Sequence, residues 1–344
     1  MKEQKNINRS NFFKKIFVKI CRIFGYELID QSNFYLSTQN KKLNENLNIQ
    51  GNKTITLPLG ETKTTRKVKS LTVIFRSCTA VNMLTQSKKR LFDQNKSEYT
   101  FRSLNSIIFS LNEAQKTCPN INFEILVVDH SSKKKDLDQI KIQLDKSNIK
   151  TSLISLDINE FISKISKINS KNEKVSTNQI SNMSNIYKSL QLAKERCNDL
   201  IYFVEDDYIH KKESINELIF TYERLSSQLN RELILCPADY PYLYTKINTT
   251  NILLGSNKHW RQIDESLCTF LTSNIILKSY WANFIAMCEF EHYPFEKPLH
   301  EIYKSEYCFS PIPSLAIHCT NINSIFGLSP NVNWKKIWDE NKDY

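Results

Sequence analysis

The sequence predicts an α/β protein: a single, mainly parallel sheet with helices on both faces. Three observations predict it. Strand-like and helix-like segments alternate between about residues 70 and 236, and this order is typical of a parallel sheet because each helix returns the chain to the same end of the sheet. The strand-like segments are continuous apolar runs, as expected of strands covered on both faces. The 344 residues suffice for one large α/β domain with appendages.

Hydrophobic periodicity defines the elements of this alternation in chain order. The expected strands are the apolar runs at 71–75, 123–128, 153–156, 200–204 and 233–236. The expected helices, in which apolar residues recur every three or four positions, lie at 101–116, around 137–144, at 182–198 and at 213–229. Beyond residue 240 the pattern loosens, and such a region commonly carries a substrate-binding face.

We place this domain at residues 69–320. Two segments precede it, at 1–30 and 31–68, and an extension follows it at 321–344. Residues 1–30 contain a basic amphipathic helix. One of its faces carries Phe13, Ile16, Phe17, Ile20 and Phe24, and the other carries Lys15, Lys19 and Arg22. Such a helix either lies in a membrane interface or packs on the main domain, and the sequence leaves both open. Residues 31–68, rich in Asn, Thr, Lys and Gln, are expected to form a linker or a poorly ordered segment.

Composition restricts the class of protein and of partner. Lys and Arg number 47 against 36 Asp and Glu, and the resulting +11 suits an anionic partner such as a membrane surface, a nucleotide or a nucleic acid. The 5 Gly form neither a Gly-x-Gly-x-x-Gly nor a P-loop pattern, which removes motif support for Rossmann dinucleotide binding and Walker-type ATP hydrolysis. The 9 Cys, without a C-x-x-C pair, are expected to be reduced thiols in a cytoplasmic protein. No apolar run approaches the ~20 residues of a membrane span, and lysines interrupt the N-terminal apolar run, unlike in a signal peptide.

Carboxylates follow two of the expected strands. Glu205, Asp206 and Asp207 come directly after the strand at 200–204, and Asp129 follows the strand at 123–128. Because the carboxyl ends of parallel strands meet at one edge of the sheet, these groups are expected to share a pocket. Adjacent carboxylates repel one another, and a hard divalent cation bound to substrate phosphates would offset their charge. The plainer alternative is a strand that runs into an acidic, solvated turn.

Four segments resemble the GT-A fold glycosyltransferases, in particular family 2. Val-Val-Asp-His-Ser-Ser at 127–132 resembles the family's Val-Val-Asp-Asp-Gly-Ser turn, and Phe-Val-Glu-Asp-Asp-Tyr at 203–208 resembles its Asp-x-Asp metal motif. Residues 181–193 resemble the helix before that motif, and 311–318 resemble a late segment in which a His completes the metal site. The chain departs from the family where His130 replaces an Asp, Ser131 replaces a Gly, and Arg76-Ser77 replaces Tyr-Asn.

The resemblance implies a role for each matching residue. It implies that Asp129 binds the nucleotide base, that Asp206 faces the ribose or the metal, and that Asp207 ligates Mg²⁺ or Mn²⁺ on the donor diphosphate. His318 and Glu205 are expected as two further metal ligands. Arg76 and Asn182 are expected as two further contacts to the nucleotide sugar. Two of these residues have structural alternatives, since a lone His among apolar neighbours is often a core residue and an Asp after a strand is often a helix cap.

A second polar set lies in the loosely patterned region. Trp260 offers a ring for a sugar and Arg261 offers a cation for a diphosphate, although surface aromatics in a loop would look the same. An inverting transfer also needs a carboxylate base to deprotonate the acceptor hydroxyl. We choose Glu301, with Asp239 as the second candidate, ahead of Asp264 and Glu265. The alternative for Glu301 is a carboxylate that only favours a helix dipole.

The function implied is that of a metal-dependent, inverting glycosyltransferase of polysaccharide biosynthesis. It would move a sugar from a nucleoside-diphosphate donor to a glycan or lipid-linked acceptor, in the cytoplasm or peripherally on the inner face of the membrane. Two other classes stay open: a nucleotidyltransferase acting on a sugar phosphate, and a non-catalytic nucleic-acid-binding protein. The former usually has a Gly-rich loop after its first strand, where this chain has Arg76-Ser77-Cys78-Thr79. For the nucleic-acid-binding class, the chain contains no recognition motif, so nucleic acid is not the expected partner.

Overall fold

A computed structural model describes residues 12–26, 54–57, 60–80, 90–245, 247 and 249–344. The chain divides into two units, Met1–Lys63 and Thr64–Tyr344. The first contains helix α1 (Phe12–Ile23) and an antiparallel hairpin of strands β1 (Thr54–Leu57) and β2 (Gly60–Lys63). Most of the expected linker at 31–68 lies outside the described residues.

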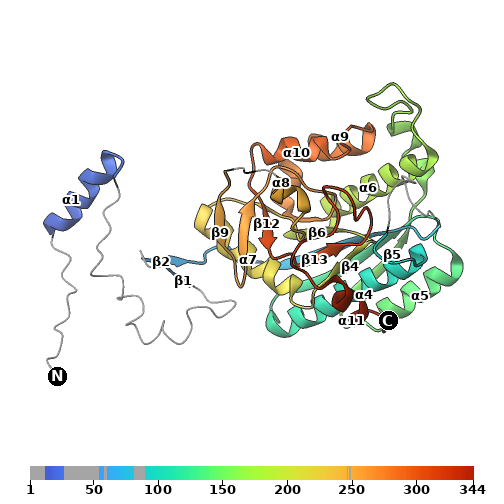
Figure 1. The fold of residues 1–344 in the computed structure, drawn as a ribbon, viewed down its shortest axis with the longest axis horizontal. Helices are drawn as coiled ribbons and strands as arrows, with labels where there is room; N and C mark the ends of the chain where they lie inside the picture. Colours follow the sequence, from blue (N-terminus) through green and yellow to red (C-terminus); the bar gives the residue numbers. More distant parts are fainter. Residues whose placement is uncertain (1–11, 27–53, 58–59, 81–89, 246, 248) are drawn as a thin grey trace. The chain divides into compact units, whose positions relative to one another are not determined.

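The second unit is built on a nine-stranded sheet (Figure 1). One half holds four parallel strands in the order β5 (Lys150–Ser155), β4 (Asn122–Asp129), β3 (Ser70–Ser77) and β6 (Leu200–Glu205). These are the four apolar runs between residues 71 and 204 that the sequence predicts as strands. Strands β3, β4 and β6 continue slightly beyond their expected bounds, whereas β5 begins at 150 instead of 153 and ends at 155 instead of 156. The prediction of an α/β fold on a mainly parallel sheet is therefore confirmed.

The other half of the sheet is mixed, which the sequence pattern did not predict. Its strands follow β6 in the order β11 (Phe270–Ser273), β8 (Ile234–Leu235), β12 (Cys308–Ile312), β10 (His259–Gln262) and β9 (Ile252–Leu254). Only β8 and β12 pair in parallel; the other pairings here are antiparallel. Strands this short carry too few residues to show a clear period, so their pairing partners and not their own sequence set their place.

Helices cover both faces of the sheet, as predicted (Figure 1). Alternate residues of the central strands point to opposite faces. Ile74 and Val128 belong to the core cluster that includes α6 residues, whereas Val73 and Val127 belong to the cluster that includes α4 and α7 residues. The helices of this unit are α4 (Lys96–Thr117), α5 (Lys134–Asp145), α6 (Thr177–Arg196), α7 (Ser214–Leu229), α8 (Asn274–Ser279), α9 (Trp281–Glu289), α10 (Lys297–Tyr303) and α11 (Trp334–Glu340), with short 3₁₀ turns at Ile158–Glu160, Ile162–Lys164 and Pro241–Tyr244.

A small two-stranded sheet positions the late part of the chain. Strand β7 (Tyr208–His210) follows the acidic run after a tight turn and pairs antiparallel with β13 (Ala316–His318), and His318 is the partner of Tyr208 in this register. The pairing brings a segment more than 100 residues away in sequence to the carboxyl edge of the main sheet.

Two features of the structure bear on the expectations from composition. All nine cysteines lie within the described residues and are thiols, seven of them buried. None of the helices in the described part of the chain is long and apolar enough to cross a membrane.

Candidate functional site

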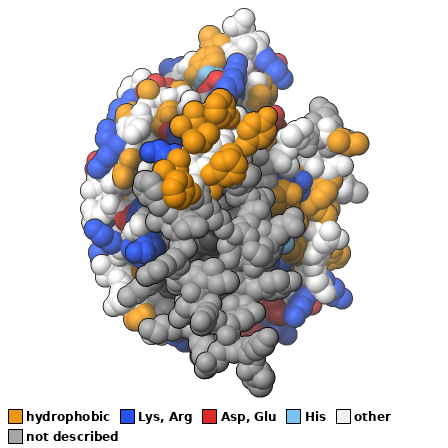
Figure 2. Space-filling model, turned by 90° about the vertical axis from the view of Figure 1, so that its left-hand side faces the viewer, with side chains coloured by type: hydrophobic (Ala, Val, Ile, Leu, Met, Phe, Trp, Pro, Cys, Tyr) orange, Lys and Arg blue, Asp and Glu red, His pale blue; other side chains and the backbone are white. Residues whose placement is uncertain are grey.

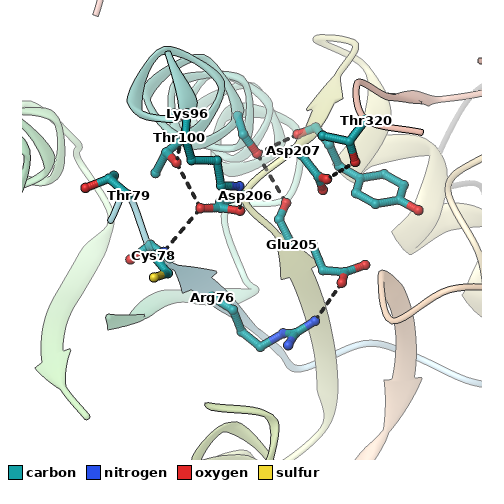
Figure 3. A network of polar contacts seen from close by, with 12 residues as sticks. Arg76, Cys78, Thr79, Lys96, Thr100, Glu205, Asp206, Asp207 and Thr320 are labelled. Carbon is teal, nitrogen blue, oxygen red and sulfur yellow. Dashed lines mark hydrogen bonds and ion pairs between the residues drawn. The ribbon is translucent and has the colours of Figure 1, made fainter. Parts of the chain in front are cut away.

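The candidate site lies at the carboxyl edge of the parallel strands, where β3, β4 and β6 end side by side. In the register of these strands, Arg76 is the partner of Glu205, and Ser77 is the partner of Asp129. Figure 3 shows that the three consecutive acids of the run point toward different partners. The chain therefore builds three separate carboxylate environments here, each with its own electrostatic surroundings.

Glu205 is paired with a guanidinium group. Arg76 Nη2 lies 2.9 Å from Glu205 Oε1, and Arg76 Nη1 donates to Asn182 Oδ1 at 3.1 Å. The backbone N–H of Glu205 donates to Thr269 Oγ1 at 3.1 Å. Burial raises the pKa of Glu205, and the positive charge of Arg76 opposes this without cancelling it. The structure thus brings together three of the predicted site residues.

Asp206 is paired with an ammonium group. It forms an ion pair with Lys96, accepts a hydrogen bond from Thr100 Oγ1 at 2.8 Å and accepts another from the backbone N–H of Cys78 at 3.2 Å (Figure 3). Burial alone would lower the pKa of Lys96, but Asp206 and Asp207 outweigh it and raise that pKa. Lys96 and Thr100 are one helical turn apart at the start of α4, so both reach the same carboxylate.

Asp207 is paired with a histidine. His318 Nε2 lies 3.3 Å from Asp207 Oδ2, and Thr320 Oγ1 donates to the same oxygen. Both acid and His are largely buried, with side-chain exposures of 15% and 7%. Burial acts to raise the pKa of Asp207, but His318 outweighs it, and the pKa lies well below the usual range. Burial likewise opposes a charged His318, but Asp207 raises its pKa above the ordinary value.

The ring of His318 is held in one orientation by three further contacts, one of which is the 2.9 Å approach of its Nε2 to Thr320 Oγ1. Its Nδ1 lies 2.9 Å from the backbone oxygen of Phe326, which fixes the tautomer with the proton on Nδ1 and turns Nε2 toward Asp207. The ring of Tyr208 stacks on it, with centroids 4.8 Å apart. The turn that presents the Phe326 oxygen needs Gly327, because a Cβ there would lie 2.3 Å from the oxygen of Ile322.

Asp207 and His318 fit a divalent cation, whereas the predicted three-ligand set is not assembled. A His that donates Nδ1–H to a carbonyl and offers Nε2 beside a carboxylate oxygen has the arrangement of a metal ligand. Among the residues the structure describes, however, no three His, Cys, Asp or Glu side chains converge to hold a metal ion. Glu205, the predicted third ligand, does not join Asp207 and His318 in this structure, because Arg76 holds its carboxylate.

Asp129 lies at the end of β4, where its carboxylate closes the following turn. It accepts hydrogen bonds from Ser77 Oγ at 2.7 Å, from Ser132 Oγ at 2.5 Å and from the backbone N–H of Ser132 at 3.2 Å. Ser131, where the resembled family has Gly, has a φ of 60°. Burial raises the pKa of Asp129 despite these hydrogen bonds. These contacts give Asp129 a turn-forming role, and its role in binding a nucleotide base stays a prediction.

The second polar set forms a buried pair and a core residue. Arg261 Nη2 lies 2.7 Å from Asp239 Oδ1, and Tyr244 OH donates to the other oxygen at 2.5 Å. Trp260 is fully buried, and its indole N–H donates to Glu217 Oε1 at 3.1 Å. The expectation that the Trp260 ring faces a sugar does not fit this placement, since the ring is part of the core between the sheet and α7.

The two candidate bases, Asp239 and Glu301, differ in their exposure to solvent. Asp239 is 1% exposed, and burial raises its pKa although Tyr244 and Arg261 act against the rise. Glu301 lies on the solvent-exposed side of α10, and its carboxylate pairs with Lys304 at 2.7 Å. The first is therefore committed to a structural pair, and the second is accessible. The role of Glu301 as the base stays a prediction.

Sequence reasoning missed Lys96, Thr100, Thr320 and Tyr208. Lys96 lies 110 residues from its partner Asp206, and its expected helix began only at residue 101. The one usable signal was the Lys-x-x-x-Thr spacing of Lys96 and Thr100, which places both side chains on one helix face. Thr320 could have been predicted from its position, since it follows the predicted ligand His318 by two residues.

Comparisons with known proteins find likeness of fold alone. No protein-family model and no curated protein matches the chain. The structure of S. aureus TarS is 14% identical with a TM-score of 0.34, over 61% of this chain and 29% of TarS. The galactosyltransferase LgtC, solved with donor and acceptor sugar analogues, is 11% identical with a TM-score of 0.31, over 59% of this chain and 58% of LgtC. The inositol-1-phosphate CTP transferase from T. maritima is 10% identical with a TM-score of 0.39, over 81% of this chain and 98% of that protein. The chain thus spans less than two thirds of the length of TarS or LgtC.

Proposed function

We propose that this protein is a glycosyltransferase that takes a sugar from a nucleoside-diphosphate donor and transfers it to a glycan or lipid-linked acceptor. We propose further that a Mg²⁺ or Mn²⁺ ion bound by Asp207 and His318 holds the donor diphosphate. The observation that carries the proposal is the approach of His318 Nε2 to Asp207 Oδ2 at 3.3 Å, at the carboxyl edge of a parallel sheet.

Charge supports a cation at this position. The acidic run contributes three carboxylates, and its permanent cationic partners are Arg76 and Lys96. Glu205 and Asp206 are thereby offset, whereas the partner of Asp207 is a His that is charged only when protonated. A divalent ion would replace the proton of His318 and leave positive charge for phosphate oxygens, which supply the ligands that the protein does not.

The chemistry of glycosyl transfer fits such a site. When the donor bond breaks, negative charge develops on the departing diphosphate, and a bound divalent cation stabilises that charge. The protein's own part is to hold the carboxylate of Asp207 and the imidazole of His318 in fixed orientations, through Thr320 and the Phe326 carbonyl. Arg76 and Lys96 keep the neighbouring acids from repelling the donor.

We further propose that transfer inverts the configuration at the sugar carbon, with Glu301 as the base that deprotonates the acceptor. What supports this choice is that Glu301 is exposed, whereas Asp239 is committed to Arg261. A nucleotidyltransferase is the less suited alternative, because residues 78–95, which follow β3, contain no Gly for a phosphate-cradling loop.

Calorimetry of UDP binding, with Mn²⁺ and with a chelator, tests the proposed donor site. We expect UDP to bind in Mn²⁺ and only weakly in chelator, because the Asp207–His318 pair carries no net positive charge for a diphosphate unless a metal ion is bound. Asp207→Asn should remove the effect of Mn²⁺, and Glu301→Gln is the matched control, since it removes one carboxylate outside the metal site. Equal affinity for UDP with and without Mn²⁺ would rule out the proposed metal site.

A further inference from the structure

The N-terminal unit contains a basic helix within an acid-free stretch of the sequence. From residue 4 to residue 26 the sequence has six basic residues and no Asp or Glu. Helix α1 (Phe12–Ile23) lies inside this stretch, has no acid in its first turn and has Arg22 in its last turn. A short helix with this charge gains little from ion pairs within itself, so its stability must come from something that its faces contact.

The apolar face of α1 is wide and exposed. Phe17 is 59% exposed and Ile23 is 75% exposed, and Phe24, just beyond the helix, is 73% exposed. Figure 2 shows hydrophobic side chains gathered in a patch with Lys and Arg side chains beside it. A contiguous patch of large apolar side chains on a helix marks a surface that is used for binding.

We propose that α1 docks this protein on an anionic lipid bilayer, with the helix lying in the interface and not crossing it. Charge complementarity selects this occupant: Lys19 and Arg22 flank the apolar side chains, and an acid-free, basic stretch suits anionic headgroups. At 12 residues, α1 is too short to span a bilayer but long enough to lie along its surface. The apolar residues would enter the acyl boundary while the cations remain at headgroup level.

This inference does not depend on the proposed transferase activity. It would place whatever reaction the second unit performs next to a membrane, where a lipid-linked substrate is concentrated. Its test therefore uses lipid binding, with melting temperature and sedimentation as controls, and no transfer assay.

Flotation of the full-length protein with vesicles tests the proposal. We expect flotation with phosphatidylcholine vesicles that contain phosphatidylglycerol and much less with phosphatidylcholine alone. Lys19→Gln/Arg22→Gln should weaken binding by about 30-fold at low salt. Binding should also weaken as salt rises toward about 1 M, where screening limits charge interactions to a few Å.

Two matched variants in the second unit separate the helix from general surface properties. Lys141→Gln/Lys146→Gln on and beside α5 removes the same charge, and Ile142→Ser compares with Phe17→Ser on α1. We expect both α5 variants to float like the wild type and Phe17→Ser to lose most of its binding. The proposal is overturned if the α5 charge variant loses as much binding as the α1 charge variant, or if the wild type floats equally well on neutral vesicles. It is also overturned if Phe17→Ser lowers the melting temperature of the second unit or dissociates a dimer in sedimentation without changing flotation, since α1 would then cover protein.

Discussion

Glu205 and Asp206 differ from Asp207 in one respect that matters chemically. The first two are each paired with a side chain that stays cationic at neutral pH, Arg76 and Lys96. Asp207 is paired with His318, whose Nε2 proton can be released to solvent when a metal ion binds. Three adjacent acids that look equivalent in sequence are therefore two structural ion pairs and one candidate ligand. Substitutions at the two kinds of carboxylate should therefore have different effects.

The largest effect is expected from removing the ligand charge. Asp207→Asn keeps the shape of the side chain but removes the charge that would hold the cation. We expect sugar transfer to fall by roughly 1,000-fold or more, because a catalytic metal contributes several kcal/mol to stabilising the developing charge. A transfer assay with UDP-sugars and Mn²⁺ checks this, with circular dichroism to show that the variant is folded. Wild-type activity in the folded variant would show that Asp207 only forms a turn.

Breaking a structural pair should affect stability instead. Lys96→Met leaves the carboxylate of Asp206 in a largely buried place without its cation. We expect the free energy of unfolding to fall by about 3 kcal/mol. Urea denaturation measures this, and the double variant Lys96→Met/Asp206→Leu should recover much of the loss because no charge is left unpaired. If Lys96→Met leaves stability unchanged, the pair does not have the role that the structure gives it.

Removing the neutral ligand should have a smaller effect than removing the charged one. We expect His318→Ala to weaken Mn²⁺ binding by about 10-fold, since Asp207 and the phosphates remain. Calorimetry of Mn²⁺ in the presence of UDP measures the change, and melting curves report the fold. A variant that is less stable but binds Mn²⁺ normally per folded molecule would identify His318 as a core residue.

The Asp207–His318 pair should also give the metal-free protein a pH-dependent stability. The pKa of His318 is raised from 6.5, so its contribution is full below that pH and is lost as pH rises through the raised value. The pKa of Asp207 is lowered from 3.8, so its contribution is present above that pH and is lost only in stronger acid. The melting-temperature difference between wild type and Asp207→Asn should therefore be greatest between pH 3.8 and pH 6.5. It should shrink as the pH rises through the raised pKa of His318. A difference that grows at alkaline pH would contradict the assigned protonation.

The smallest effect on stability is expected at the exposed candidate base. Glu301→Gln breaks only a surface pair with Lys304, and such pairs contribute little. We expect an unchanged melting temperature, so that any loss of transfer in this variant reports on chemistry. A clear drop in melting temperature would show that Glu301 supports the fold of α10.

The sequence predicted the parallel half of the fold well because its strands are long apolar runs with helices between them. It did not predict β11, β10 or β9, since strands of three or four residues are placed by their neighbours. The same contrast holds in the site. The position of Glu205 to Asp207 follows from the end of an apolar run, whereas Lys96 and Thr320 reach them from segments more than 100 residues away. Trp260 shows the opposite error, because its residue type suits sugar binding but its burial assigns it to the core.

Mn²⁺ titration followed by electron paramagnetic resonance, with UDP present, tests most directly whether Asp207 is chemically distinct from its neighbours. The intensity of the free Mn²⁺ signal is measured for the wild type, Glu205→Gln and Asp207→Asn at matched concentrations of folded protein. We expect wild type and Glu205→Gln to bind Mn²⁺ alike and Asp207→Asn to leave it in solution. Equal binding by Asp207→Asn and the wild type, or loss of binding in Glu205→Gln alone, would contradict the assignment.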